Sequence, residues 1–214
     1  VGLNAAATSL NAIAIGTGSS ASGENSLAIG VGNQVSGNGS GAFGDPNVVT
    51  GSGSYAFGND NIIDANNAFA LGNNISIAAS LDESVGIGNG STVSAPNVGA
   101  FSINGGLIAG TAPVAVVSIG SAGAERQLTH VAAGVVSASS TDAVNGSQLF
   151  AVGNALSNQG NGFAAALGGG AVVAPNCTVT APSYAVQGGT QTNVGEALTA
   201  LNTAPSSVPW TCCL

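Results

Sequence analysis

The chain has 214 residues, of which 5% are charged and 34 are glycine, and its formal net charge is −8. It contains no lysine and a single arginine, Arg126, so it lacks the cluster of cations with which proteins neutralise nucleic-acid phosphates. No apolar run reaches the roughly 20 residues of a membrane-spanning helix, and the first ten residues lack the basic and apolar regions of a signal peptide.

A repeat of fourteen residues fills the first part of the chain. Each unit closes on a glycine that follows a large apolar residue. The closing positions are Gly2, Gly16, Gly30, Gly44, Gly58, Gly72, Gly88, Ser102 and Gly120, with insertions of two and four residues late in the series. We expect the large residues before them to stack in one buried column, the core ladder Ile15, Ile29, Phe43, Phe57, Leu71, Ile87, Phe101 and Ile119.

Each unit is predicted to hold two short strands. The first alternates large and small apolar residues, as in Ile13-Ala14-Ile15, so its large side chains point to one side and its small ones to the other. The second strand carries one aliphatic residue and gives a second column: Ala21, Val35, Val49, Ile63, Ile77, Val93 and Leu107. Glycine, asparagine and serine lie between the strands and favour tight turns. Two strands and two turns per unit predict a parallel β-solenoid with coils about 4.8 Å apart.

A coil this thin buries little apolar surface, and a repeat array needs neighbours and caps. We therefore expect the small residues of the first strands to form a flat surface that packs against another copy of the chain. These residues are Ala14, Ala28, Ala42, Ala56 and Ala70. The alternative is a thin strand that faces solvent in a monomer.

Two segments make a family recognisable. The unit NSLAIG at Asn25 to Gly30, and the serine- and glycine-rich turns between such units, resemble the head repeats of trimeric autotransporter adhesins, the YadA-like surface proteins of Gram-negative bacteria. The segment VSIGSAGAERQLTHVAAGVVSASSTDAVNGSQL, from Val117 to Leu149, resembles the neck of the same family. The resemblance implies a mainly β fold, in which a left-handed parallel β-roll of 14-residue repeats forms a trimeric head.

The same resemblance divides the chain. We expect a YadA-like β-roll head over residues 1–120, a neck over 121–148, a short coiled-coil segment over 149–162, a small β connector with a helix start over 163–202, and a disordered tail over 203–214. Pro205 and Pro209 prevent a helix from continuing into the tail.

The neck is predicted to contain the start of a helix. Thr141 and Asp142 place a capping residue and an acid at the positive end of a helix dipole. Leu149, Val152 and Leu156 follow at coiled-coil spacing. In the family, the neck passes each chain to its neighbour, and the resemblance implies interface or neck roles for Glu125, Arg126, Asp142, Asn145 and Leu149.

The connector is predicted to begin with a hairpin. Val172-Val173 and Val179 flank a turn at Pro175-Asn176, and a further helix is expected from Asn193 to Asn202. Cys177 stands where the family usually has glycine. A cysteine in the left-handed region would cost about 1 kcal/mol, so we expect this turn to be rearranged.

The sequence offers no candidate catalytic residue, no cofactor site and no metal site. Its one histidine, His130, is expected to have a structural role, and Cys212-Cys213 lack metal-site spacing. The resemblance implies a non-enzymatic adhesin at the bacterial cell surface and outer membrane. It would be a homotrimer that binds host matrix proteins, cell-surface receptors or glycans, and that reaches the membrane through a C-terminal anchor domain outside this sequence.

Two other functions compete with the adhesin. An ice-binding or other flat-array solenoid would use its serine, threonine and asparagine ladders to order water, but it has no use for a neck and stalk. A polysaccharide-processing β-helix would need paired acids in a cleft, whereas the acids here are scattered.

Overall fold

The computed structural model describes residues 2–99, 102–103 and 106–203. The chain divides into two compact units. The first comprises the residues up to His130 together with Val136–Thr141, and the second comprises Val131–Val135 together with the residues from Asp142 onward.

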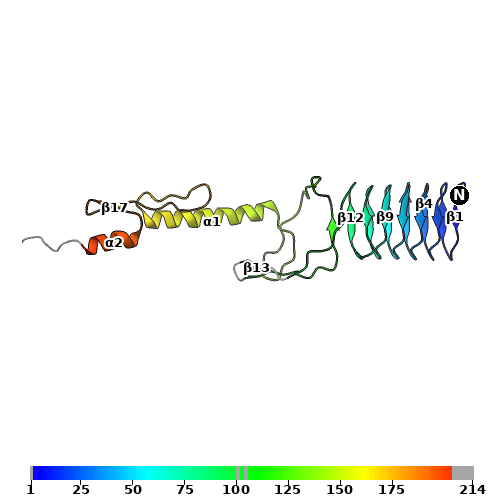
Figure 1. Cartoon of the computed structure of the whole chain (residues 1–214), viewed down its shortest axis with the longest axis horizontal. Coiled ribbons are helices and arrows are strands. Elements are labelled where there is room, and N and C mark those ends of the chain that lie inside the picture. The colour runs from blue at the N-terminus through cyan, green and yellow to red at the C-terminus, as the bar shows by residue number, and fades with distance from the viewer. Residues whose placement is uncertain (1, 100–101, 104–105, 204–214) are drawn as a thin grey trace, which may run out of the picture. The chain divides into compact units, whose positions relative to one another are not determined.

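The first unit is a parallel β-solenoid built from two facing sheets, whose strands stack coil upon coil in Figure 1. The long sheet contains β2 (Ile13–Ile15), β4 (Leu27–Gly30), β6 (Gly41–Gly44), β8 (Tyr55–Phe57), β10 (Phe69–Leu71), β12 (Val85–Ile87) and β15 (Val117–Ser118). The short sheet contains β1 (Ala6–Ala7), β3 (Ser20–Ala21), β5 (Gln34–Val35), β7 (Asn47–Val49), β9 (Asn61–Ile63) and β11 (Ser76–Ile77). Strands of successive coils pair in parallel one repeat apart, as Ala28 does with Ala14 and Ala42. The predicted solenoid and its fourteen-residue register are confirmed.

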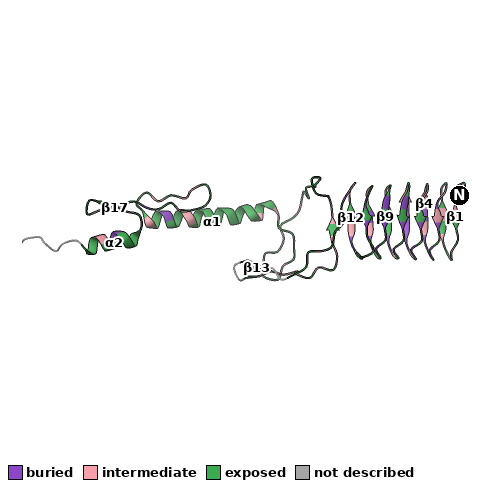
Figure 2. Ribbon diagram, in the orientation of Figure 1, coloured by how far each residue is buried: buried purple, intermediate pink, exposed green. Residues whose placement is uncertain are grey.

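The small residues of the long sheet, and not its large ones, point into the interior of the coil, which is the reverse of what we expected. Ala28, Ala42, Ala56 and Ala70 are 0% exposed and lie between the sheets, opposite the second column, of which Val35, Val49, Ile63 and Ile77 are at most 1% exposed. Figure 2 shows this buried interior along the stack. The alanines therefore cannot form an outer packing surface, and that prediction is wrong; Ala14, in the first long-sheet strand, is half-buried and also packs against this core.

The large residues of the long sheet point outward. Ile15, Leu71 and Ile87 are 45%, 48% and 37% exposed, so the prediction of a buried column is wrong for the chain by itself. The reason is the narrow gap between the sheets, which admits a methyl group opposite a valine or isoleucine but no second large side chain. The outward ladder is Ile15, Ile29, Phe43, Phe57, Leu71 and Ile87, with half-buried Ile119 after β15. Phe101 lies outside the described residues.

One coil shows how tightly the interior is filled. Asn33, Asn47 and Asn61 occupy the same buried position in successive coils, and the next coil has Ile75 there. In that coil the alanine column continues as Gly86, where a Cβ atom would lie only 2.7 Å from Cγ2 of Ile75. The larger isoleucine is thus accommodated by the loss of a methyl group across the gap.

The glycine that closes each coil is required by two constraints. Gly44 has a φ of 124°, which L-residues rarely adopt. A Cβ atom at this position would also lie 1.9 Å from the carbonyl oxygen of Gly58 in the next coil. The repeat therefore ends on glycine because neighbouring coils approach one another backbone to backbone.

The last coil contains a long excursion. After β12 the chain continues the coil as far as Thr92, which bridges Ser76, and the core residue Val93. Because Val85 of β12 pairs directly with Val117 of β15, the chain after Val93 leaves the stack and returns at β15. Within it, β13 (Ser102–Ile103) and β14 (Gly106–Leu107) form an antiparallel pair. The predictions that Ser102 closes a coil and that Leu107 continues the second column are wrong. Pro96 and Pro113, which have no N–H to donate to a parallel ladder, lie on either side of this pair.

The second unit contains α1 (Gly146–Leu167), an antiparallel bridge between Val173 and Val179, the hairpin of β16 (Tyr184–Val186) and β17 (Gly189–Gln191), and α2 (Val194–Asn202). Cys177 adopts a φ of 62° in the first turn and donates its N–H to the carbonyl of Ala174 at 2.9 Å. The cysteine therefore takes the left-handed conformation, and the expected rearrangement is wrong.

Helix α2 begins after the N-cap Asn193, as predicted. Of the tail predicted over 203–214, Thr203 is described and is the C-cap of α2, and the rest lies outside the described residues. Among the described helices, none is long and apolar enough to cross a membrane.

Candidate assembly and binding surfaces

The outer face of the long sheet is apolar from one end to the other. Most strands place two large side chains on this side, because the small residue between them points inward, while in β6 the first of these positions is Gly41. The resulting apolar face consists of Ile13, Leu27, Tyr55, Phe69, Val85 and Val117 in one column and the outward ladder named above in the other. In soluble proteins, contiguous exposed apolar surface of this extent typically marks an interaction site.

Aromatic rings occupy the middle of the apolar face. The rings of Phe43 and Phe57 stack with centroids 4.5 Å apart and an angle of 5° between their planes. The ring of Phe69 follows at 5.6 Å from that of Phe57. Tyr55 lies over Gly41, where a Cβ atom would be 2.8 Å from Cδ1 of the tyrosine. The absence of a side chain at Gly41 therefore leaves room for the tyrosine ring.

The outer face of the short sheet has a different character. Its exposed residues are mixed: Gln34 and Ser76 flank Val48 and Ile62 along the stack. The hydroxyl of Thr50 on this side donates to Oδ1 of the next coil's Asp64 at 2.6 Å. The two faces of the solenoid thus differ in polarity, and only the long-sheet face is continuously apolar.

Arg126 caps the open end of the solenoid. Its Nη2 donates to the carbonyl of Asn89 at 2.7 Å, and its Nη1 donates to the carbonyl of Ile119 at 2.7 Å and to Oγ of Ser91 at 3.2 Å. A Cβ atom on Gly88 would meet Cζ of Arg126 at 2.9 Å, where the equivalent glycines of earlier coils meet the backbone of the next coil. The guanidinium therefore takes the place of a further coil. These contacts lie within one chain, and the interface role with a neighbouring chain that the resemblance implies for Arg126 stays a prediction.

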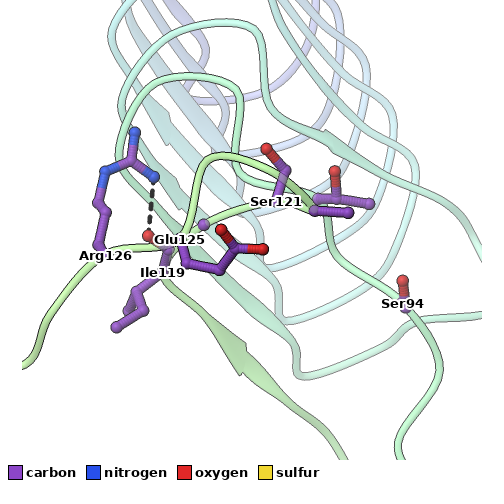
Figure 3. Close-up of a pocket in the computed structure, with 8 residues that line it drawn as sticks. Ser94, Ile119, Ser121, Glu125 and Arg126 are labelled. Atoms are coloured by element: carbon purple, nitrogen blue, oxygen red, sulfur yellow. Dashed lines mark hydrogen bonds between the residues drawn. The ribbon is translucent and has the colours of Figure 1, made fainter.

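A pocket of about 520 Å³ lies beside this cap. Its lining residues are Thr92, Ser94, Ile119, Gly120, Ser121, Ala122, Glu125 and Arg126. In Figure 3 the guanidinium of Arg126 and the carboxylate of Glu125 point away from one another. Oε1 of Glu125 accepts the N–H of Gly123 at 2.8 Å, and this bond, followed by one from its own backbone amide, lowers the pKa of Glu125. The pocket thus carries an ionised carboxylate near neutral pH.

The start of α1 is fixed by a capping box. The side chain of Asn145 accepts the N–H of Gln148, whose own Oε1 accepts the N–H of Asn145. The helix therefore begins at Gly146, and the start predicted at Thr141-Asp142 is wrong. Asp142 instead accepts the N–H of Val135 at 2.9 Å, which places it in the preceding loop.

Gln148 has a second use that sequence reasoning missed. Its Oε1 accepts the N–H of Gly134 at 3.1 Å, and its Nε2 donates to the carbonyl of the same residue at 2.7 Å. Nδ2 of Asn145 donates to the carbonyl of Val131 at 3.1 Å. Both side chains thus tie the segment Val131–Val135 to the start of α1. The Asn-x-x-Gln spacing is a capping-box pattern and could have identified Gln148.

Helix α1 carries an exposed apolar row. Leu149, Val152, Leu156 and Phe163 are all exposed and recur at three-, four- and seven-residue spacing. This spacing is typical of a coiled-coil seam. The described part of the chain contains no partner for this row.

No candidate centre for catalysis or metal binding emerges from the described residues, which include no group of three or more histidine, cysteine, aspartate or glutamate side chains placed to hold a metal ion. His130 adopts a φ of 61° in the loop before α1, and its Nδ1 lies 3.1 Å from the hydroxyl of Thr129.

Comparison with known proteins gives one family model, described as the coiled stalk of trimeric autotransporter adhesin, which matches residues 127–172. The trimeric autotransporter adhesin AtaA of Acinetobacter sp. (strain Tol 5) is 47% identical over 96 residues, which make up 44% of this chain and 3% of AtaA. The autotransporter adhesin BtaE of Brucella suis biovar 1 is 62% identical over 50 residues, 23% of this chain and 7% of BtaE. The autotransporter adhesin EhaG of Escherichia coli O157:H7 is 44% identical over 84 residues, 39% of this chain and 5% of EhaG.

Two solved structures are also similar. The C-terminal YadA-like domain of BPSL2063 from Burkholderia pseudomallei has 33% identity and a TM-score of 0.39, with 55% of this chain and 51% of that chain covered. The collagen-binding domain of the Yersinia adhesin YadA has 27% identity and a TM-score of 0.37, with 71% and 88% covered. The chain spans only 3% to 7% of the length of the curated relatives.

Proposed function

The chain belongs to the trimeric autotransporter adhesins, and from this premise we propose that it is the head, neck and stalk region of a non-enzymatic surface adhesin. In this proposal three parallel copies pack their apolar faces against one another. The assembled head then presents its outer, mixed face to host matrix proteins, receptors or glycans. The observation that carries the proposal is the continuous exposed apolar face of the long sheet.

The energetics favour self-association through this face. Its side chains are held in two straight columns by the coil register, so an identical face can meet it along its whole length. Burying an exposed leucine, isoleucine or phenylalanine contributes about 1.5–3 kcal/mol when burial is complete. Because these side chains are already half-buried, about 1 kcal/mol for each is reasonable. Roughly ten of them per copy supply enough to offset the cost of association, which is about 4–15 kcal/mol.

The stalk helix supports the same assembly. The exposed row of α1 needs partners with the same spacing, and other copies of the chain supply them. Knobs from two neighbouring helices would cover Leu149, Val152 and Leu156. The family to which the chain belongs is named for its trimers, which favours three copies over two.

Adhesion is assigned to the surface that assembly leaves exposed. With the long sheets buried together, the short sheets face outward, and each repeats the same backbone geometry from coil to coil. Three such surfaces in one head multiply weak contacts into firm attachment. An ice-binding array is not favoured, because Val48, Ile62 and Asp64 interrupt the hydroxyl-bearing positions of this face.

By this proposal the protein works at the bacterial cell surface, attached to the outer membrane through a part of the full protein beyond this sequence. The proposed parts keep the boundaries given above: head to residue 120, neck to 148, coiled coil to 162 and β connector to 202.

The test separates assembly from adhesion. We expect the chain to sediment as a trimer and to bind surfaces coated with collagen, fibronectin, laminin or glycans. Leu71→Asp, on the apolar face, should yield monomers. The matched control Gln34→Asp, which makes the same charge change on the outer face, should leave the trimer intact. A stable folded monomer of the parent chain at micromolar concentration would overturn the assembly, and a trimer that binds none of these surfaces would overturn the adhesion.

A further inference from the structure

We propose that Gln159 forms a polar layer in the core of the stalk and thereby fixes the axial register of three copies of α1. This role rests on the proposed function, because it needs the trimer, and it adds which residue aligns the chains within that trimer. Three features carry it: the position of Gln159 on the helix, the surroundings of its side chain and the repetition of the head.

Gln159 occupies a seam position of α1. It lies three residues after Leu156 and four residues before Phe163, both of which belong to the exposed apolar row. It also lies seven residues after Val152, so these two side chains occupy the same position in successive heptads. In a coiled coil formed along this row, the amide of Gln159 therefore points into the core, between layers of apolar side chains.

The surroundings of Gln159 leave its amide available for such a layer. Its side chain is exposed and has no hydrogen-bond partner among the residues that the structure describes. The neighbouring row of the helix is already covered by the same chain, because Ala164 is 6% exposed and a Cβ atom on Gly160 would lie 3.1 Å from Cγ2 of Val173. The second unit thus covers one side of α1 and leaves the side that carries Gln159 open to other copies.

Three glutamine amides at one level can satisfy one another. Each amide has two N–H donors and a carbonyl acceptor, so three that meet at the same height can bond in a ring. After a slip of one heptad, the amide of Gln159 lies level with Val152 or Ala166 of a neighbouring copy, and neither side chain can form a hydrogen bond. Burying a polar group without a hydrogen bond is unfavourable. The layer is therefore complete only when the three helices are in register.

The apolar face of the head defines the register poorly. Its outward ladder repeats from coil to coil, so a copy that is displaced by whole coils again sets large apolar side chains against large apolar ones. A pair of coils rises by roughly 10 Å, and one heptad of a helix rises by nearly the same distance. Head and stalk can thus slip together and keep much of their apolar contact. Among the exposed seam residues of α1, Gln159 is the polar side chain that opposes this slip.

The experiment exchanges the two residues that share this heptad position in the full chain. Val152→Gln combined with Gln159→Val keeps the composition and moves the polar layer by one heptad. Parent and exchanged chains with different affinity tags are unfolded together, refolded under reducing conditions and separated by tag. We expect each chain to form its own trimers. Mixed trimers should be at least about tenfold rarer than in a refolded mixture of two differently tagged parent chains, because mixing buries unpaired amides.

The matched control exchanges Ala151 and Asn158, which are also seven residues apart but lie on the side of α1 away from the seam. Ala151→Asn combined with Asn158→Ala should mix freely with the parent. Free mixing of the Val152 and Gln159 exchange with the parent would overturn the proposal, as would equal segregation of the control.

A single substitution tests the register directly. Gln159→Val removes the layer and should still fold, since Val152 occupies the equivalent position one heptad earlier. Spin labels are placed at Ser157→Cys in chains whose three native cysteines are replaced by serine, and the distances between labels are measured. We expect one distance in the parent background and an additional, longer one in Gln159→Val. A single unchanged distance in Gln159→Val would overturn the proposal.

Sedimentation of the parent separates this role from the proposed function. A parent chain that sediments as a monomer would overturn the proposed assembly and the polar layer with it. A parent trimer whose exchanged and Gln159→Val chains behave like the controls would overturn the polar layer alone.

Discussion

Replacing Arg126 with alanine should open the last coil of the solenoid. The side chain makes three hydrogen bonds, two of them to backbone carbonyls, and covers Gly88 where no further coil follows. Hydrogen bonds to charged groups contribute about 1.5–3 kcal/mol each. Because Arg126 is exposed, water can replace part of each bond, and about 1 kcal/mol apiece is a better figure. We therefore expect the free energy of unfolding to fall by about 2–3 kcal/mol.

The place where stability is lost is as informative as the amount. A solenoid is stabilised by contacts between neighbouring coils, so removing an end cap frays the adjacent coil first. Native-state hydrogen exchange should show lost protection in β12 and β15, while β2 and β4 keep theirs. Thermal unfolding followed by circular dichroism should shift downward by roughly 5–10 °C.

Two comparisons sharpen this test. Arg126→Lys should recover only part of the loss, because one ammonium cannot span the carbonyls of Asn89 and Ile119 as a planar guanidinium does. Glu24→Ala, an exposed change elsewhere on the head, should have little effect. If Arg126→Ala melts and exchanges like the parent, the end of the solenoid is held by apolar packing and the capping argument is wrong.

Three further outcomes can be measured. Gly44→Ala should destabilise the solenoid by more than about 3 kcal/mol in thermal or denaturant unfolding, because the φ of 124° and the close carbonyl of the next coil both exclude a methyl group. The control Gly39→Ala, where φ is 63° and nothing lies within 4 Å of the added methyl group, should cost only about 1 kcal/mol. Equal losses of stability in the two variants would contradict this reasoning. Gly86→Ala should be strongly destabilising alone and much less so when combined with Ile75→Ala, and additive losses in this double-mutant cycle would show that the two residues do not share space. Hydrogen bonds from the backbone N–H and the hydroxyl of Thr192 lower the pKa of Glu196 from its ordinary value of 4.5. The contribution of Glu196 to the stability of the start of α2 is therefore present above pH 4.5 and is lost as the pH falls through the lower pKa of the folded state. Hydrogen-exchange protection at the start of α2 should decline with acid in the parent and stay constant in Glu196→Gln.

The sequence by itself determined the architecture of the head. A fixed period of fourteen residues, with glycine at one position and a large apolar residue before it, leaves room only for short parallel strands joined by tight turns. The structure has these strands in the predicted register. The helix after Asn193 could likewise be predicted, because its N-cap and its apolar spacing are local features.

Which side of the long sheet faces inward was decided only by the tertiary structure. Alternation in a strand says that Ala42 and Phe43 point to opposite sides, but it does not say which side is the interior. The answer depends on the distance between the two sheets of one coil, and this gap has room for alanine alone opposite the second column. The sequence pattern therefore identified both columns and assigned them to the wrong sides.

Contacts between distant parts of the chain were also beyond the sequence. The fourteen-residue spacing predicted that Ser102 closes a coil, but Ser102 lies in β13, which pairs with β14, and β12 pairs with β15. Strand pairing depends on which segments meet in the folded chain and not on sequence spacing alone. The resemblance placed Arg126 in the neck, but its role as a cap and its partners, the carbonyls of Asn89 and Ile119, became apparent only in the folded chain. Local sequence patterns determine the repeat period, the turns and the helix caps. Which side of a sheet is buried, and which group a side chain contacts, depend on the elements that the fold brings together.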